Sequence, residues 1–206
     1  MIFVRYENWK SYLRFYPATS LLLLANFVLF LIVSFDGGST NVETMLRYGA
    51  LYSLDPYKSD GWRYFASMFL HNGFEHLFFN SFALLVLTPP LERIMGSFRY
   101  LVLYLGSGLL GNVLSVSYYA QSSSIPHWLV GASGAIYGVY GGLLYIAMLQ
   151  RDKMDEASRK MLYTLLIMGA VFSFLPSIGW MAHLGGAIGG FFIYGLMVRL
   201  FKSSRM

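Results

Sequence analysis

Apolar residues dominate the chain in six runs, which short polar or proline-containing segments separate. Most runs approach the roughly 20 residues that a helix needs to cross the hydrocarbon core of a bilayer. The pattern predicts one all-α domain over residues 1–206, a polytopic membrane bundle of six transmembrane helices. We expect these helices at residues 18–35, 66–88, 100–119, 129–148, 161–175 and 180–198.

The connecting segments differ in character. Residues 1–16 place basic residues among aromatic ones, which is typical of an amphipathic lead-in at the membrane interface. Residues 36–61 are long for a structureless loop and apolar in places, so we expect a partly ordered element that hugs the membrane. Pro89 and Pro90 cannot continue a helix, so the second span should end at Thr88, before a turn at residues 91–99.

Composition narrows the class further. Only 12% of the residues are charged, against about 25% in a typical soluble domain, which is too few for a water-facing surface. The absence of cysteine excludes disulfides and thiolate chemistry. The N-terminus lacks a short apolar core followed by a small-residue cleavage site, so we expect no removable signal peptide.

The basic residues predict the orientation. With the N-terminus inside, twelve of the fifteen Lys and Arg residues fall on inner segments and three, Arg47, Lys58 and Arg63, on outer ones. The positive-inside rule then puts both termini in the cytoplasm, in a multi-pass protein of the cell membrane. The net charge of +5 faces the anionic inner leaflet, so the lipid bilayer accounts for it and no nucleic-acid partner is expected.

Polar residues collect in the outer halves of three spans. In this topology the second, fourth and sixth spans run inward, with Ser133 about four residues into the fourth and His183 about three into the sixth. His71, His76 and Asn80 occupy the outer half of the second. Polar groups that persist in lipid usually face the bundle interior and carry function. We therefore expect one polar layer near the outer leaflet.

Small residues predict a close contact between the fourth and sixth spans, because they let helices approach each other. They form one ridge on each span, namely Gly134, Gly138 and Gly142 on the fourth and Gly186 and Gly190 on the sixth. Taken alone, a serine among glycines at a helix entrance is more often a packing motif than a nucleophile.

The sequence disfavours two kinds of catalytic site, a metal centre and a pair of carboxylates. The metalloprotease motif His-Glu-x-x-His does not occur, and His71 and His76, five residues apart, would point far apart around a helix, so we expect no metal site. Every Asp falls in a loop, which leaves an aspartyl protease without paired carboxylates. A hydroxyl becomes a nucleophile when an adjacent imidazole takes its proton, and Ser133 and His183 are the candidates.

Five fragments, in order, resemble the rhomboid family of intramembrane serine proteases. They are Trp62-Arg63, His71-x4-His76-x3-Asn80, Glu92-x3-Gly96, Gly131-Ala132-Ser133-Gly134 with Tyr137, and Ala182-His183-x2-Gly186-x3-Gly190. The chain is similar to the minimal six-helix bacterial form. One departure is Ile94, where the family often has an arginine. It concerns the packing of the inner turn and not the chemistry at the opposite end.

The resemblance implies a protease that needs no cofactor and no metal. Ser133 would attack the peptide carbonyl and His183 would act as the base of a catalytic dyad, with Tyr137 packed on its ring. The substrates would be single-span membrane proteins, which approach laterally past the fifth span and are cut near the outer leaflet.

The supporting roles also come from the resemblance. His76 and the Asn80 amide, together with the backbone N–H of Ser133, would stabilise the oxyanion. His71 and Gly131 would support the site, and the Trp-Arg dipeptide would be structural.

Two other functions are open to a chain of this kind. A catalytically inactive rhomboid-like protein that binds membrane clients would lack the serine or the histidine, and both are present. A small transporter or channel would show paired halves or polar groups in both leaflets. Here no internal repeat is visible, and the polar groups cluster in one leaflet.

Overall fold

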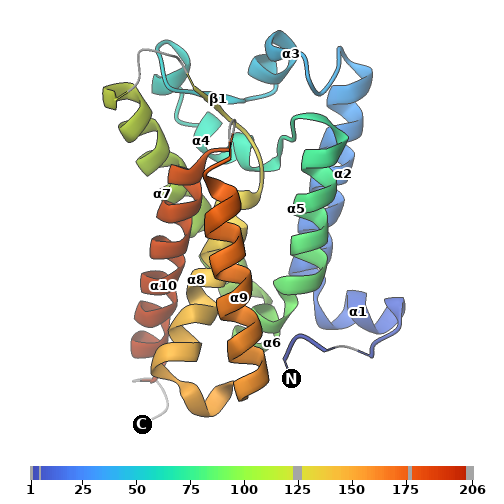
Figure 1. Cartoon of the computed structure of the whole chain (residues 1–206). Helices are drawn as coiled ribbons and strands as arrows, with labels where there is room; N and C mark the ends of the chain where they lie inside the picture. Colours follow the sequence, from blue (N-terminus) through green and yellow to red (C-terminus); the bar gives the residue numbers. More distant parts are fainter. Residues whose placement is uncertain (1, 5, 123–126, 176–177, 203–206) are drawn as a thin grey trace.

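The computed structural model describes residues 2–4, 6–122, 127–175 and 178–202, which form a bundle of α-helices (Figure 1). The helices are α1 (Trp9–Phe15), α2 (Pro17–Phe35), α3 (Val42–Arg47), α4 (Arg63–Ala66), α5 (Gly73–Leu87), α6 (Pro89–Met95), α7 (Ser97–Ser122), α8 (Ser133–Leu149), α9 (Glu156–Ser173) and α10 (Trp180–Lys202). Three 3-10 turns, η1 (Tyr57–Ser59), η2 (Ser67–Phe69) and η3 (Arg151–Lys153), lie between them. The predicted class, a helical membrane bundle, is confirmed.

The helix α8 forms the centre of the bundle. It packs against both α7 and α10, and most of its residues are buried, among them Ala135, Val139 and Leu143. A helix that is buried on nearly every side is apolar all round, and this run of glycines and aliphatic residues meets that condition. On the far side α2 packs on α5 and α7, whereas α9 lies against α8 and α10.

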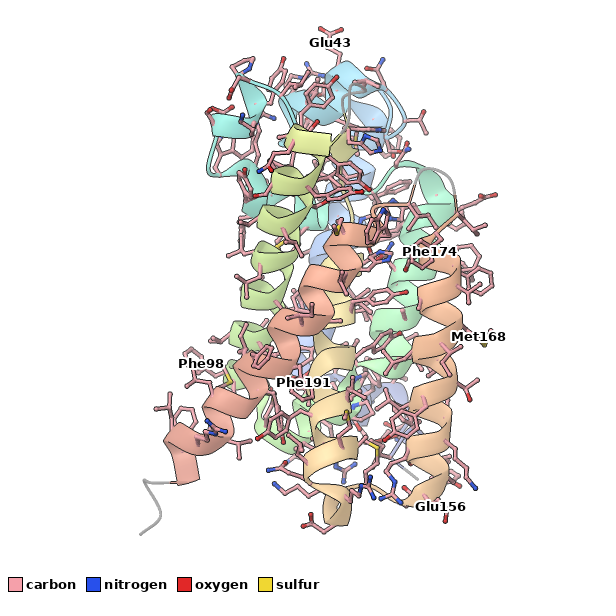
Figure 2. All side chains as sticks on the ribbon, turned by 60° about the vertical axis from the view of Figure 1, so that its left-hand side comes forward. Glu43, Phe98, Glu156, Met168, Phe174 and Phe191 are labelled. Atoms are coloured by element: carbon pink, nitrogen blue, oxygen red, sulfur yellow. The ribbon has the colours of Figure 1, made fainter. Side chains whose placement is uncertain are left out.

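Large apolar side chains face outward along the helices. Figure 2 shows Met168 projecting from α9, Phe174 projecting just after the end of that helix, and Glu43 and Glu156 at the two ends of the molecule. Among the described residues, α2, α7 and α10 are each long and apolar enough to cross a bilayer, and α5 with α6 passes as one broken span bent by 42°. The chain is therefore a multi-pass integral membrane protein.

Two helices fall short of that test of length and composition. The apolar helix α8 has 17 residues, so it is slightly shorter than a standard span. The helix α9 carries Glu156, Arg159 and Lys160 near its start, and only its later part is apolar. Both helices run beside α10 through the bundle (Figure 1).

The predicted second span and the turn after it need correction. Residues 66–88 are not one helix, because η2 ends at Phe69 and α5 begins at Gly73. The expected turn at residues 91–99 is the helix α6, which Pro89 opens and Gly96 ends with φ +80°. Proline suits the first turn of a helix, since the N–H it lacks has no partner there.

The fourth span also begins later than predicted. Residues 128–129 form the strand β2 (Trp128–Leu129), which pairs antiparallel with β1 (Leu51–Tyr52) at one end of the bundle (Figure 1). The helix α8 begins only at Ser133. Two other helices begin earlier than predicted, α7 at Ser97 and α9 at Glu156.

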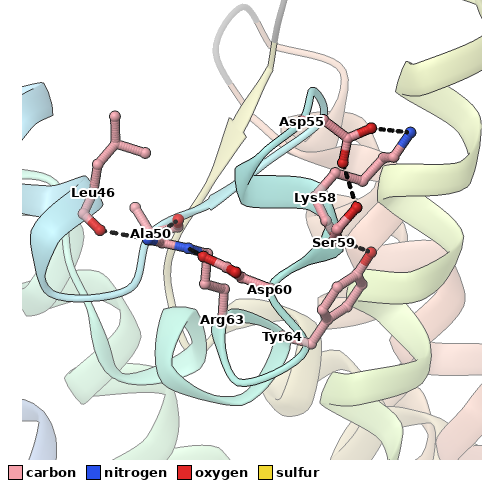
Figure 3. A network of polar contacts seen from close by, with 8 residues as sticks. All are labelled: Leu46, Ala50, Asp55, Lys58, Ser59, Asp60, Arg63 and Tyr64. Atoms are coloured by element: carbon pink, nitrogen blue, oxygen red, sulfur yellow. Dashed lines mark hydrogen bonds and ion pairs between the residues drawn. The ribbon is translucent and has the colours of Figure 1, made fainter.

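The connection between α2 and α5 is ordered, as its apolar residues predict. Figure 3 shows Arg63 at its centre. The guanidinium donates to the carbonyl oxygens of Leu46 at 2.5 Å and Ala50 at 3.2 Å, and it pairs with Asp60 at 2.8 Å. Arg63 is buried, and these bonds tie the connection together, so its contribution is structural.

A buried carboxylate organises the opposite end. Glu92 in α6 accepts hydrogen bonds from the backbone N–H of Ala18 at 2.9 Å and from the Ser97 hydroxyl at 2.7 Å. It also accepts from the N–H of Thr19 at 2.9 Å and from its hydroxyl at 2.6 Å. Because the first N–H groups of a helix lack intrahelical partners, this carboxylate caps the start of α2. Ile94 leaves these bonds undisturbed.

Candidate active site

Ser133 and His183 meet, although they are far apart in the sequence. Ser133 is the first residue of α8, and His183 lies in the first turn of α10, which begins at Trp180. The Nε2 atom of His183 lies 2.8 Å from the Oγ atom of Ser133. The side chain of His183 is only 9% exposed, and Ser133 is partly exposed. A hydroxyl that is hydrogen-bonded to an imidazole is the arrangement that activates a serine.

Glycines bring α8 and α10 close enough for this bond. A Cβ atom at Gly186 would overlap the carbonyl oxygen of Gly134, and one at Gly190 would overlap that of Gly138. The backbones of the two helices therefore touch along this seam. The close contact expected from the small residues is present.

One glycine of the predicted ridge points elsewhere. A Cβ atom at Gly142 would meet Leu91 and Leu103, and Gly141 instead faces the Ala187 carbonyl on α10. Each step of four residues turns about 40° around a helix, so a residue eight positions after Gly134 has rotated by about 80°. A step of seven residues drifts by only about 20°, which keeps Gly141 on the seam.

Tyr137 lies against His183. Its ring stacks on the His183 ring with centroids 4.2 Å apart and an interplanar angle of 4°. On the other side α9 approaches closely, since a Cβ atom at Gly169 would be 2.5 Å from the Tyr137 hydroxyl. The stacking fixes the plane of the imidazole.

The second ring nitrogen of His183 contacts a residue that sequence reasoning missed. The Oγ atom of Ser173, the last residue of α9, lies 2.7 Å from His183 Nδ1. The Tyr137 hydroxyl lies 3.2 Å from the same Oγ. The signal in the sequence is only a serine hydroxyl in a largely apolar run, which also contains Thr164. Such residues commonly bond only to their own helix.

His76 and Asn80 lie one turn apart on α5. The Asn80 amide donates to the His76 carbonyl at 2.9 Å, and its buried Oδ1 has no partner among the described residues. The Nδ1 atom of His76 is 3.3 Å from the backbone N–H of Asn72. It therefore accepts this bond, which assigns the ring proton to Nε2.

Gly131 allows the His76 ring to approach the segment before Ser133. A Cβ atom at Gly131 would be 2.7 Å from both Cε1 and Nε2 of that ring. Its φ of +118° is a conformation that glycine adopts without strain, and its N–H donates to the Ser67 carbonyl at 2.9 Å. The proton-bearing edge of His76 thus lies beside the backbone that leads into Ser133.

His71 does not occupy its predicted position. It precedes α5, is 1% exposed, and packs edge-on against His76 with ring centroids 5.3 Å apart. The prediction that the two rings point apart is wrong, because it assumed that both residues share one helix. Within the described residues no group of three His, Cys, Asp or Glu side chains could hold a metal ion.

The fold and the site together define a class, that of multi-pass helical membrane proteins with a serine–histidine pair at one end of the bundle. The rhomboid domain model matches residues 58–200. The chain belongs to the rhomboid family, and the resemblance seen in the sequence is confirmed.

Relatives in the same family share about a third of the aligned residues with this chain and differ widely in length. The YdcA protein of Bacillus subtilis (strain 168) is 36% identical over 199 residues, which cover 96% of this chain and 97% of that protein. Rhomboid protease GluP of the same bacterium is 35% identical over 175 residues, 84% of this chain and 33% of GluP. Rhomboid-type serine protease 2 of Emericella nidulans is 33% identical over 132 residues, 62% of this chain and 25% of that protein.

Proposed function

We propose that the chain is an intramembrane serine protease of the cell membrane, which cleaves single-span membrane proteins near the outer leaflet. Ser133 is the nucleophile and His183 is the general base. The observation that carries the proposal is the 2.8 Å hydrogen bond between Ser133 Oγ and His183 Nε2. A protein that only binds membrane clients has no need of a hydroxyl that is partly exposed and hydrogen-bonded to a buried imidazole.

The reaction is acyl transfer to the serine followed by hydrolysis. His183 Nε2 takes the proton as Ser133 Oγ bonds to the peptide carbonyl carbon, and it returns that proton to the leaving amine as the C–N bond breaks. Water then attacks the acyl-enzyme, with the same nitrogen as base. The Tyr137 ring, stacked at 4.2 Å, keeps the imidazole in plane through both steps.

The developing oxyanion is stabilised by donors on one side of Ser133. Ser133 begins α8, so its own N–H lacks an intrahelical partner and lies at the positive end of the helix dipole. The Nε2–H of His76 and the Asn80 amide supply side-chain donors from α5. Preorganised donors of this kind usually make the largest contribution to the rate.

The membrane topology in this proposal has six crossings and cytoplasmic termini. Besides the three helices and the bent pair that meet the length and composition test, α8 and α9 complete the crossings beside α10. Twelve of the fifteen basic residues then lie on the inner side. Ser133 and His183 fall toward the outer side, where water and an unwound substrate segment reach them.

Cleavage of a reporter tests the function. The purified protein is reconstituted in vesicles with a fluorescent single-span substrate, and wild type is compared with Ser133→Ala and His183→Ala. We expect each substitution to lower the rate by about 10⁴-fold or more, while thermal unfolding stays at the wild-type temperature. Wild-type rates in Ser133→Ala would overturn the proposal. So would the absence of both substrate cleavage and Ser133 labelling by a fluorophosphonate.

A further inference from the structure

Ser173 differs from its neighbours on α9. Val171, Phe172 and Phe174 are 65%, 52% and 73% exposed on the outer surface of the bundle, whereas Ser173 is 6% exposed. The polar side chain therefore faces inward at the end of α9, where the apolar side chains next to it face outward. In lipid a buried hydroxyl needs partners, since an unbonded one is costly.

One arrangement of protons makes all three contacts of Ser173 Oγ hydrogen bonds, and donor and acceptor capacity identifies it. Ser173 Oγ lies 2.7 Å from the Gly169 carbonyl, which only accepts, so the hydroxyl proton is used there. The bond of 2.7 Å to His183 Nδ1 must then have the ring as donor. The Tyr137 hydroxyl, at 3.2 Å, donates to the remaining lone pair of Ser173.

This assignment fixes the tautomer of the base. With the proton on Nδ1, the Nε2 atom of His183 is a bare acceptor directed at Ser133 Oγ, 2.8 Å away. Ser133 therefore donates, which is the direction that proton transfer requires. Among the described residues His183 has no carboxylate partner for Nδ1. The Ser173 hydroxyl occupies the position that an aspartate occupies in a Ser-His-Asp triad.

We propose that Ser173 is a positioning residue, which holds His183 in the Nδ1–H tautomer and thereby makes its Nε2 available to Ser133. The inference rests on the proposed proteolytic function. The site is then assembled from three helices, with the nucleophile on α8, the base on α10 and the acceptor that orients the base on α9.

The competing explanation is that Ser173 only bonds to its own helix. Thr164 provides the matched control, because it lies on the same helix and its hydroxyl donates to the Lys160 carbonyl four residues earlier at 3.0 Å. Thr164 is exposed. A residue that acts only through such a bond should be replaceable without an effect on His183.

Kinetics give the first test. In the vesicle assay we expect Ser173→Ala to lower kcat by about 10- to 100-fold with KM nearly unchanged, while Thr164→Ala stays at the wild-type rate. Ser173→Thr should retain most of the activity, and its isostere Ser173→Val should lose it. The Thr and Val pair keeps the test decisive even if Ser173→Ala does not fold. Equal rates in these two variants would overturn the proposal.

A spectroscopic readout separates this inference from the proposed function. Nitrogen-15 NMR of histidine-labelled protein reports which ring nitrogen carries the proton, and His183→Gln assigns the signal. We expect Nδ1–H in the wild type and in Ser173→Thr, and a shift toward Nε2–H in Ser173→Val. An unchanged tautomer in Ser173→Val overturns the role of Ser173, whatever the proteolysis assay shows. Absence of proteolysis with the expected tautomers overturns only the proposed function.

Discussion

Two polar clusters are buried at opposite ends of the bundle, and they differ in how fully their hydrogen bonds are satisfied. In the Glu92 cluster, which consists of Glu92, Thr19 and Ser97 with the Ala18 N–H, each carboxylate oxygen accepts two bonds. The Ser133 cluster consists of the candidate active-site residues Ser133, His183, Tyr137, Ser173, His76, Asn80 and His71. In it the Oδ1 of Asn80 and the Nε2 of His71 are buried without partners among the described residues.

The difference teaches how to separate structural from chemical polar groups in a membrane protein. A fully bonded buried network stabilises one arrangement of helices and offers nothing to a ligand. Unpartnered buried atoms in the same cluster as a bonded hydroxyl and imidazole remain free to bond to another molecule, and a catalytic role is one explanation for such atoms. The first cluster should therefore control folding and the second should control turnover.

The largest expected effect is on stability, at Glu92. Glu92→Ala leaves several donors unbonded at the start of α2, so we expect it to lower the free energy of unfolding by about 3–5 kcal/mol. Ser97→Ala removes one donor and should cost about 1 kcal/mol. Unfolding by SDS in mixed micelles measures both. Unfolding of Glu92→Ala at the same SDS fraction as the wild type would contradict the comparison. Loss of cleavage by the molecules of this variant that remain folded would contradict it as well.

The next effect is on turnover, at Asn80. Asn80→Leu removes a proposed oxyanion donor, so we expect kcat to fall by about 10²–10³-fold, with stability kept or raised because a buried polar atom without a partner is removed. Asn26 on α2 is the matched control, since it is also buried and neither of its amide atoms has a partner among the described residues. Asn26→Leu should leave the cleavage rate within about twofold of wild type. Similar rates for the two variants would remove Asn80 from the catalytic group.

The smallest effect concerns an exposed carboxylate. Hydrogen bonds from the Ser158 hydroxyl and backbone N–H lower the pKa of Asp155 to about 2, from its usual value of 3.8. A depressed folded-state pKa stabilises the protein above the unfolded pKa, and this contribution disappears as pH falls from about 4 to about 2. Asp155→Asn keeps the helix cap without the titration. The difference in unfolding temperature between the two proteins should therefore shrink over that range, and a constant difference would contradict the assignment.

The sequence predicted the elements that depend on local pattern. Long apolar runs required membrane helices, and the glycines around Ser133 and His183 required a close helix pair. The start of α8 could not be predicted, because residues 128–129 pair with β1 from a distant part of the chain. Such a contact overrides the local preference of Leu129 and Val130 for continuing an apolar helix.

The candidate site, too, could be predicted only where the local sequence marks a residue, and not where a contact with a distant segment decides its role. His183 stands out because ionisable side chains are rare in membrane helices, and Ser133 stands out only together with the other fragments that resemble the rhomboid family. Ser173 does not stand out, since its role depends on a contact with another helix. The edge-on packing of His71 against His76 was missed because the prediction carried one helix through Asn72 and Gly73, where α5 in fact begins.

The order of the helices along the chain has a consequence for biosynthesis. Ser133 lies on α8, and His183 follows two helices later on α10. As the ribosome delivers the chain to the membrane, the hydroxyl is inserted while the imidazole is still untranslated. In the proposed mechanism a nascent molecule therefore has no activated nucleophile until α10 has packed against α8 along the glycine seam.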